Sequence, residues 1–249
     1  ELHEQAIYHH EGEAFLVDRL DLEAREAVVR AADVDHYTVP VVSVELEVIE
    51  ARERRALPDG AVGFGDVRVT ERVAAFKKVR YRTGEHLGYG AVELPPRATE
   101  TEAVWIAPPD PLPGELAALP GATLAAAVEG LGSALHQVAA LRLMCDARDL
   151  ALCLQADPGA KRAPAEPEAR RFVPALHVYD AHEGGVGLSE RVFEEAEAIL
   201  ADALRLVERC PCARGCPACV GPAGEDGTSV KALAAPVARY LLGAGGWPS

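Results

Sequence analysis

The chain has 249 residues, of which 49% are hydrophobic and 26% are charged, and its mean hydropathy is +0.01. This composition indicates a globular protein and excludes a disordered chain or a collagen-like fibre. The formal net charge of −14 argues against diffuse binding to nucleic acid, because that attraction needs a cationic surface. We expect no membrane partner, since no apolar run approaches about 18 residues and no signal-peptide pattern opens the chain.

The first hundred residues predict β-strands. Residues 39–49 alternate, with apolar side chains such as Val42 on one face and polar ones such as Ser43 on the other. Turn signals at residues 58–60 and a proline break at 94–96 divide the strands that follow. We expect these further strands at residues 61–70, 72–82 and 103–106. Short strands divided by turn residues are typical of a small antiparallel barrel or sandwich, predicted here for residues 1–110.

A proline-rich segment at residues 108–113 predicts a domain boundary, and beyond it the apolar period becomes helical. Apolar residues recur every three or four positions between Leu124 and Leu141, which predicts an amphipathic helix. Gly130 and Gly132 lie inside this helix and cost about 1 kcal/mol each relative to alanine, so we expect them to allow close packing. Downstream we expect strands at 150–154 and 172–179, a surface loop at 155–171, and helices at 189–209 and 229–242. Residues 111–249 are therefore predicted to form a mixed α/β domain, and the whole chain an α+β fold.

Four of the six cysteines fall within ten residues, which indicates a metal site. They are Cys210, Cys212, Cys216 and Cys219. Four thiolates suit tetrahedral zinc, and the two-residue spacer before Cys219 lets a tight turn aim two sulfurs at one ion. Because protein ligands fill all four positions, we predict one structural zinc ion rather than a catalytic one. Arg209 and Arg214 are candidates to offset its negative charge.

The alternative for the same segment is a redox pair at Cys216 and Cys219. Thioredoxin-type C-x-x-C motifs begin a helix after a strand, whereas this one follows a predicted helix. Two further cysteines beside the pair also favour zinc. The separate residues Cys145, Cys153 and His136 lie on apolar segments, and we expect them in the core.

A glycine-rich turn with Gly184, Gly185 and Gly187 leads from a predicted strand into a predicted helix. Backbone N–H groups at the start of a helix can face a phosphate, which makes the turn a candidate phosphate site. The alternative is tight packing of the strand against the helix. The turn matches neither the dinucleotide fingerprint nor the P-loop, and the sequence contains no Walker A motif. We therefore predict that this chain has no ATPase activity of its own.

Basic and aromatic residues interleave between residues 72 and 82. The candidate nucleic-acid contacts are Arg72, Phe76, Lys77, Lys78, Arg80, Tyr81 and Arg82. The cations would contact phosphates, and Phe76 or Tyr81 would stack on bases. Strand alternation puts Lys77 and Tyr81 on one face and Phe76 and Lys78 on the other, so only one set can face a bound strand. The alternative is a solvated strand that discourages edge-to-edge aggregation.

Together these residues resemble the C-terminal portion of bacterial MrfA-like superfamily II DNA helicases. The zinc-binding domain of that family is marked by a Tyr-Asp and Gly-Gly-x-Gly turn, a helix and a C-x-C-x3-C-x2-C cluster. This sequence has Tyr179-Asp180, the turn at residues 184–187 and the four cysteines. Further matches extend the resemblance over nearly the whole chain, at residues 2–8, 17–21, 37–38 and 94–105.

The resemblance implies a non-catalytic accessory region of an ATP-dependent helicase that moves 3′ to 5′ on single-stranded DNA. It further implies a role in DNA repair, upstream RecA-like motor domains as partners, and a place in the bacterial cytoplasm at the nucleoid. The chain opens on Glu1 and its one methionine is Met144, so we expect a piece of a longer polypeptide. The alternative function is a zinc-stabilised module that docks the motor or a repair partner.

Overall fold

The computed structural model describes residues 2–109, 119–156, 174–221 and 229–244, which fall in two compact units. The first unit consists of Glu1–Glu45 with Thr70–Ala98, and the second of Leu46–Val69 with Thr99–Ser249. Neither unit is continuous in sequence, because the two longest strands, β4 (His36–Leu57) and β5 (Gly60–Arg80), each belong partly to both. The predicted boundary near residue 110 lies outside the described residues, and the compact units divide the chain elsewhere.

The first unit is built from antiparallel strands. β1 (Ile7–His10), β2 (Glu13–Asp21) and β3 (Glu26–Ala31) form a three-stranded sheet in that order. β6 (His86–Ala91) pairs antiparallel with the end of β5. The core of this unit includes Val17 and Phe76, neither of which exposes any surface, and His3, whose ring stacks on Phe76 with centroids 4.6 Å apart.

The sequence pattern locates these strands but not all of their ends. The predicted strand at 39–49 is the middle of β4, and the predicted strands at 61–70 and 72–82 are one continuous strand, β5. The alternation runs through the residues between them, so no turn residue divides the two halves. The predicted strand at 103–106 is the end of β7 (Arg97–Ala107).

The second unit places one sheet against a group of helices. The sheet has the order β4-β5-β7-β9-β8, where β8 is Leu150–Ala156 and β9 is Pro174–Asp180. β9 runs antiparallel to both of its neighbours. The helices are α2 (Gly121–Leu143), the short 3-10 turn η1 (Ala147–Asp149), α3 (Leu188–Glu194), α4 (Ala196–Arg209) and α5 (Val230–Leu241). The α+β class is confirmed, while most of the predicted loop at 155–171 lies outside the described residues.

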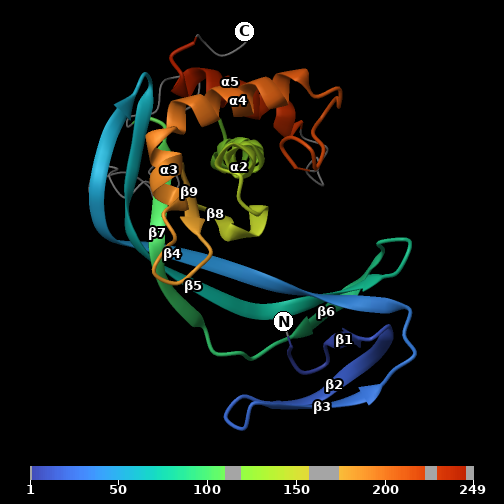
Figure 1. Cartoon of the computed structure of the whole chain (residues 1–249). Coiled ribbons are helices and arrows are strands. Elements are labelled where there is room, and N and C mark those ends of the chain that lie inside the picture. Colours follow the sequence, from blue (N-terminus) through green and yellow to red (C-terminus); the bar gives the residue numbers. More distant parts are fainter. Residues whose placement is uncertain (1, 110–118, 157–173, 222–228, 245–249) are drawn as a thin grey trace. The chain divides into compact units, whose positions relative to one another are not determined.

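Helix α2 is the centre of the second unit. Figure 1 shows it end-on, with α4 and α5 on one side and β8 and β9 on the other, and it packs against all four. The two glycines inside α2 permit these contacts. A Cβ at Gly130 would lie 2.3 Å from a methyl carbon of Val230 on α5, and one at Gly132 would lie 2.5 Å from Leu176 on β9. The expected close packing at both glycines is therefore confirmed.

Residues Thr123–Leu143 of α2 are long and apolar enough to cross a membrane by length and composition, with a mean hydropathy of 1.3. Glu129, His136 and Gln137 interrupt the segment, so it is not a continuous apolar run, and the expectation of no membrane partner stays a prediction. In the described fold 61% of this segment is buried inside the protein, and Leu131 and Leu135 are 1% and 0% exposed. Core helices of water-soluble folds reach the same hydropathy, and α2 has the environment of one.

The helix predicted at 189–209 is divided into α3 and α4 at Glu195, whose φ and ψ of −98° and 12° leave the helical range. The apolar period continues across this break, which is why the sequence pattern does not reveal it. Ala196, Ile199, Ala203 and Val207 are buried as the period predicts. Helix α4 ends at Arg209, and the cysteine segment follows at once.

Candidate metal centre

The four cysteines are brought together by a reversal of the chain between α4 and α5. Cys210 leaves α4 in an extended conformation, Gly215 adopts a φ of +132°, and the Cys219 N–H donates to the carbonyl of Cys216 at 2.9 Å. Only glycine adopts such a φ without strain. This reversal gathers all four Sγ atoms within 4.8 Å of one another.

The spacing of the sulfurs fits a tetrahedral metal site. The Sγ–Sγ distances are 3.6 Å between Cys210 and Cys216, 3.5 Å between Cys212 and Cys219, and 3.7 Å between Cys216 and Cys219. A tetrahedron of sulfurs about 2.3 Å from a central zinc has edges of about 3.8 Å. A redox pair would need only Cys216 and Cys219 close together, whereas here four sulfurs gather at similar spacing. The geometry therefore favours zinc over the redox pair.

The thiols also perturb one another in a way that a cation would relieve. A backbone hydrogen bond from Cys212 and side-chain hydrogen bonds from the neighbouring thiols lower the pKa of Cys210 to about 7. Burial, and then the hydrogen bonds with its neighbours, raise the pKa of Cys212 to about 12. The hydrogen bond with Cys210 is the main cause that raises the pKa of Cys216. Four thiolates this close need a divalent cation to ionise together, so the donor set fits zinc in number, chemistry and spacing.

Two side chains from other elements hold the cysteine segment. The Lys231 ammonium on α5 donates to the carbonyl oxygens of Cys210 at 2.5 Å and Cys212 at 2.8 Å. The Gln137 amide on α2 donates to the carbonyls of Pro217 and Cys219, both at 3.2 Å. The cysteine motif predicts neither residue, because both lie outside it in sequence.

The cation that donates hydrogen bonds to the cysteine segment is Lys231, which the sequence analysis does not predict. Arg209 and Arg214 are exposed, and no side-chain hydrogen bond or ion pair of theirs is found among the described residues. The role of Arg209 and Arg214 in offsetting the charge of the thiolates stays a prediction. The one sequence signal for the Lys231 contact is that a lysine lies in the first turn of the helix after the last cysteine.

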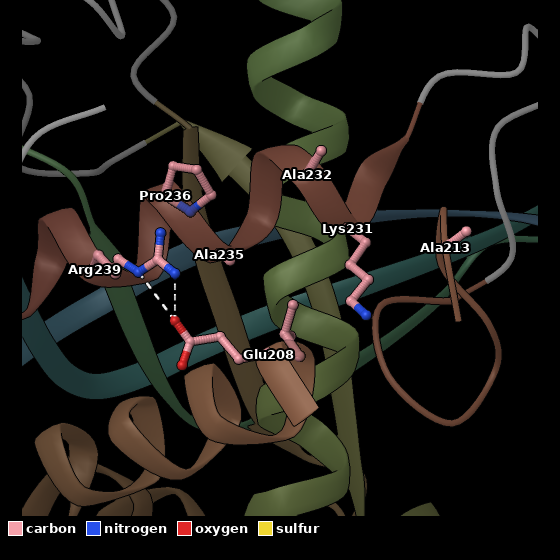
Figure 2. A pocket seen from close by; sticks show the side chains of 8 residues that line it. Glu208, Ala213, Lys231, Ala232, Ala235, Pro236 and Arg239 are labelled. Carbon is pink, nitrogen blue, oxygen red and sulfur yellow. Dashed lines mark hydrogen bonds and ion pairs between the residues drawn. The ribbon is translucent and has the colours of Figure 1, made fainter. Parts of the chain in front are cut away.

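A shallow pocket of about 460 Å³ lies beside the cysteine segment, between the end of α4 and α5. Figure 2 shows Lys231 extending from α5 toward the segment that holds Ala213, while Arg239 pairs with Glu208 at 2.5 Å. Both signs of charge line the pocket, and its remaining walls are small apolar residues. This lining selects for no particular ion, and the pocket adds no site of its own to the metal centre.

The glycine-rich turn binds a carboxylate of the chain itself. Asp180 at the end of β9 is 1% exposed, and its carboxylate accepts hydrogen bonds from the N–H groups of Val186, Leu188 and Ser189 at 2.6, 3.2 and 2.7 Å. The Ser189 hydroxyl donates to the same carboxylate at 2.6 Å. The Gly184 and Gly185 amides donate to the backbone carbonyls of Glu100 and His182.

This network corrects the phosphate interpretation of Gly184, Gly185 and Gly187. The amides of Gly184, Gly185, Val186, Leu188 and Ser189 already have acceptors, and a buried carboxylate occupies the place of the expected anionic ligand. The turn thus joins β9 to α3 tightly, which is the alternative interpretation. An aspartate four residues before the first glycine is the available signal, because a carboxylate at that position can accept hydrogen bonds from the amides of the turn.

The structure separates the candidate nucleic-acid residues on β5 and the turn after it. Phe76 is fully buried, so the prediction that it stacks on bases is wrong. Lys78 lies on the same face, with its Nζ 5.8 Å from the centre of the Phe76 ring. The Arg80 Nε lies 3.5 Å from carboxylate oxygens of both Asp35 and Glu85, so acidic groups offset its charge.

The other candidates lie closer to solvent. Tyr81 is 36% exposed, and its hydroxyl is hydrogen-bonded to His9 while its ring lies 5.5 Å from that of Tyr37. Arg72, Lys77 and Arg82 are exposed. The neighbouring Tyr89 on β6 is 62% exposed, and the basic run in β5 gives no signal for it.

The remaining predicted core residues are structural. Cys153 is buried and Cys145 half-buried, and burial is the main cause that raises the pKa of each thiol. The Nε2 atom of His136 lies 2.8 Å from the carbonyl oxygen of Ala147 and 3.0 Å from that of Leu150, which fastens η1 to α2. Cys153 therefore lies in the core of the second unit, and Cys145 and His136 lie at the edge of that core.

Comparison with known proteins gives matches over most of the chain. Residues 131–220, which contain the cysteine cluster, match the family model of the MrfA Zn-binding domain. The Bacillus subtilis protein named uncharacterized ATP-dependent helicase YprA is 33% identical over 222 residues, which are 88% of this chain and 28% of YprA. The ATP-dependent helicase HRQ1 of Saccharomyces cerevisiae is 29% identical over 88% of this chain and 20% of its own length.

The solved structures of the DUF1998 helicase MrfA match as well. The structure of MrfA bound to DNA has a TM-score of 0.65 and 31% sequence identity, over 96% of this chain and 30% of MrfA. The structure with DNA and AMPPNP has a TM-score of 0.55 and 28% identity. The chain thus spans less than a third of the length of YprA, HRQ1 and MrfA.

Proposed function

Because this chain contains an MrfA Zn-binding domain and matches the C-terminal part of the MrfA, YprA and HRQ1 helicases, we propose that it is the zinc-binding accessory region of an ATP-dependent DNA helicase. The four sulfurs at tetrahedral spacing inside the matched residues carry this proposal. The ion would be structural, since four protein thiolates leave no open position for a substrate or water.

Elemental analysis tests the metal. One zinc per chain is expected from the purified protein, and Cys210→Ser should lose it. Cys145→Ser is the matched control, because that thiol lies outside the cluster. A metal-free protein with a disulfide between Cys216 and Cys219 would instead establish the redox alternative.

The chain's part in the helicase is non-catalytic under this proposal. Its sequence contains no Walker A motif, and the amides of the glycine-rich turn and the start of α3 donate to Asp180. ATP hydrolysis would belong to RecA-like motor domains elsewhere in the longer protein, and the whole would move 3′ to 5′ on single-stranded DNA in repair at the bacterial nucleoid. The isolated chain should hydrolyse no ATP, with or without DNA, and DNA-stimulated hydrolysis would refute this part.

We place the DNA contact on the first unit. A net charge of −14 repels polyanions at long range, so binding must be concentrated where cations cluster. Lys77 is exposed on the face of β5 opposite the buried Phe76, and Arg82 is exposed in the turn that follows β5. No ion pair of either cation is found among the described residues. Such cations bind phosphates without regard to sequence.

Fluorescence anisotropy with a labelled oligothymidylate at several salt concentrations tests this contact. Lys77→Gln with Arg82→Gln should weaken binding and reduce the slope of log K against log salt by about one for each phosphate interaction removed. Arg148→Gln is the matched control, since that side chain is 90% exposed in the second unit. Equal affinity and slope in all three proteins would refute the placement.

The second candidate function is protein docking, which one observation favours. Leu141 and Met144 at the end of α2 are 78% and 88% exposed, and they form a small apolar surface that a motor domain or a repair partner could cover. Leu141→Ser with Met144→Ser should then release a purified motor fragment from the chain without changing DNA affinity. Retained motor binding by this variant would argue against docking at α2.

A further inference from the structure

Tyr89 is the most exposed aromatic side chain in the part of the chain that the structure describes, at 62%. It lies on β6, the edge strand that pairs with β5. Its exposed fraction leaves the ring accessible from solvent, which stacking on a base requires.

Two side chains surround the Tyr89 ring. Lys77 lies directly opposite it in the β5–β6 register, with its Nζ 6.0 Å from the ring centre. The imidazole of His86 meets the ring edge-on, at 4.4 Å between centroids and an interplanar angle of 65°. The histidine packs against the phenol ring and fixes its orientation, and the lysine puts a positive charge over the ring, while 62% of the tyrosine stays exposed.

The pairing pattern also decides which face of β5 can bind a ligand. Phe76 is fully buried and packs on His3, and a Cβ at Gly90, opposite Phe76, would lie 2.2 Å from the Phe76 ring. That face belongs to the core of the first unit. Lys77 and Tyr89 point to the other face, so an exposed cation and an exposed aromatic ring lie on the same surface.

We propose that Tyr89 and Lys77 form a stacking site for one base of single-stranded DNA. The proposal rests on the proposed DNA-binding function and names the residue that grips a base. An exposed ring beside a cation is how proteins bind single strands without regard to sequence, with the base on the ring and the phosphate on the cation. Bases within a duplex are stacked on one another, so the site selects single strands over duplexes.

Anisotropy titrations of the full chain with three labelled probes test the site: oligothymidylate, an abasic strand of equal length and a duplex. Wild type should bind oligothymidylate more tightly than either of the others. Tyr89→Ala should weaken binding to oligothymidylate by between about fivefold and a hundredfold, the range for loss of one stacked base. It should leave the affinity for the abasic strand unchanged.

Three variants sharpen the result. Tyr89→Phe keeps the ring and should bind as wild type does. Lys77→Gln should weaken binding to oligothymidylate and to the abasic strand alike, because it removes a phosphate contact. Tyr8→Ala is the control, since Tyr8 is also exposed in the first unit, at 38%, but lies on β1.

The possible failures are distinguishable. If wild type binds oligothymidylate and Tyr89→Ala binds it equally well, the stacking site is overturned while the DNA contact stands. If wild type binds none of the probes, the proposed DNA contact of this chain is overturned together with the stacking site.

Discussion

Asp180→Ala should strongly destabilise the second unit. The substitution leaves the amides of Val186, Leu188 and Ser189 without their acceptor. Each unsatisfied buried donor costs about 1–3 kcal/mol, and water can reach the Val186 amide because that residue is 58% exposed. We therefore expect a loss of about 3–5 kcal/mol, near the upper end for single substitutions.

Urea unfolding followed by circular dichroism measures the loss, and hydrogen exchange localises it. The three amides should exchange faster in Asp180→Ala, while exchange in the first unit stays unchanged. Glu183→Ala is the matched control, because that carboxylate is exposed in the same turn. A stability within about 1 kcal/mol of the control would refute the role of Asp180. Added phosphate should not slow hydrogen exchange of these amides in the wild-type protein. If the turn bound phosphate, the exchange would become slower.

Lys231→Met should weaken zinc binding by about 10- to 100-fold in a competition with a chelator, because residues that hold metal ligands have effects of this size. Arg239→Met, on the same helix, should leave the zinc affinity unchanged. Gly130→Ala should lower the free energy of unfolding despite a gain in helix propensity of about 1 kcal/mol, since its Cβ would lie 2.3 Å from a valine methyl group of α5. Arg148 lowers the pKa of Asp146 from 3.8 to about 2 through a side-chain hydrogen bond. This pair therefore stabilises the fold above pH about 4 and loses its effect as the pH falls toward 2, and NMR titration of Arg148→Ala should return the pKa toward 3.8.

The sequence is most informative where the signal is local. The four cysteines are predicted as a set because ligand spacing within one turn is a short-range property. Helix α2 and its two glycines are predicted because an apolar period with small residues inside it indicates a buried helix. The break at Glu195 is not predicted because the period of apolar residues does not change there.

The sequence is least informative where the answer depends on distant elements. Alternation along β5 defines two faces, but it cannot tell which face meets the core, so the pattern assigns Phe76 to DNA when it belongs to the interior. Lys231 and Gln137 reach the cysteine segment only because α5 and α2 pack beside it. Tyr89 becomes a neighbour of Lys77 through strand pairing, which no local pattern in β5 contains.

Because β4 and β5 each belong partly to both compact units, the start of β5 is made on the ribosome long before the rest of its core. The start of β5 carries Val62 and Phe64, which are 0% and 2% exposed in the finished core. They belong to the same apolar cluster as Val237 on α5, which lies more than 170 residues later in the chain. The first unit is complete in sequence once Ala98 has been made. At about 5–20 residues per second, α5 is complete about 7–29 seconds later, and the apolar side chains at the start of β5 lack their full core until then. Nascent chains that stop before α5 are therefore expected targets for chaperones and proteases.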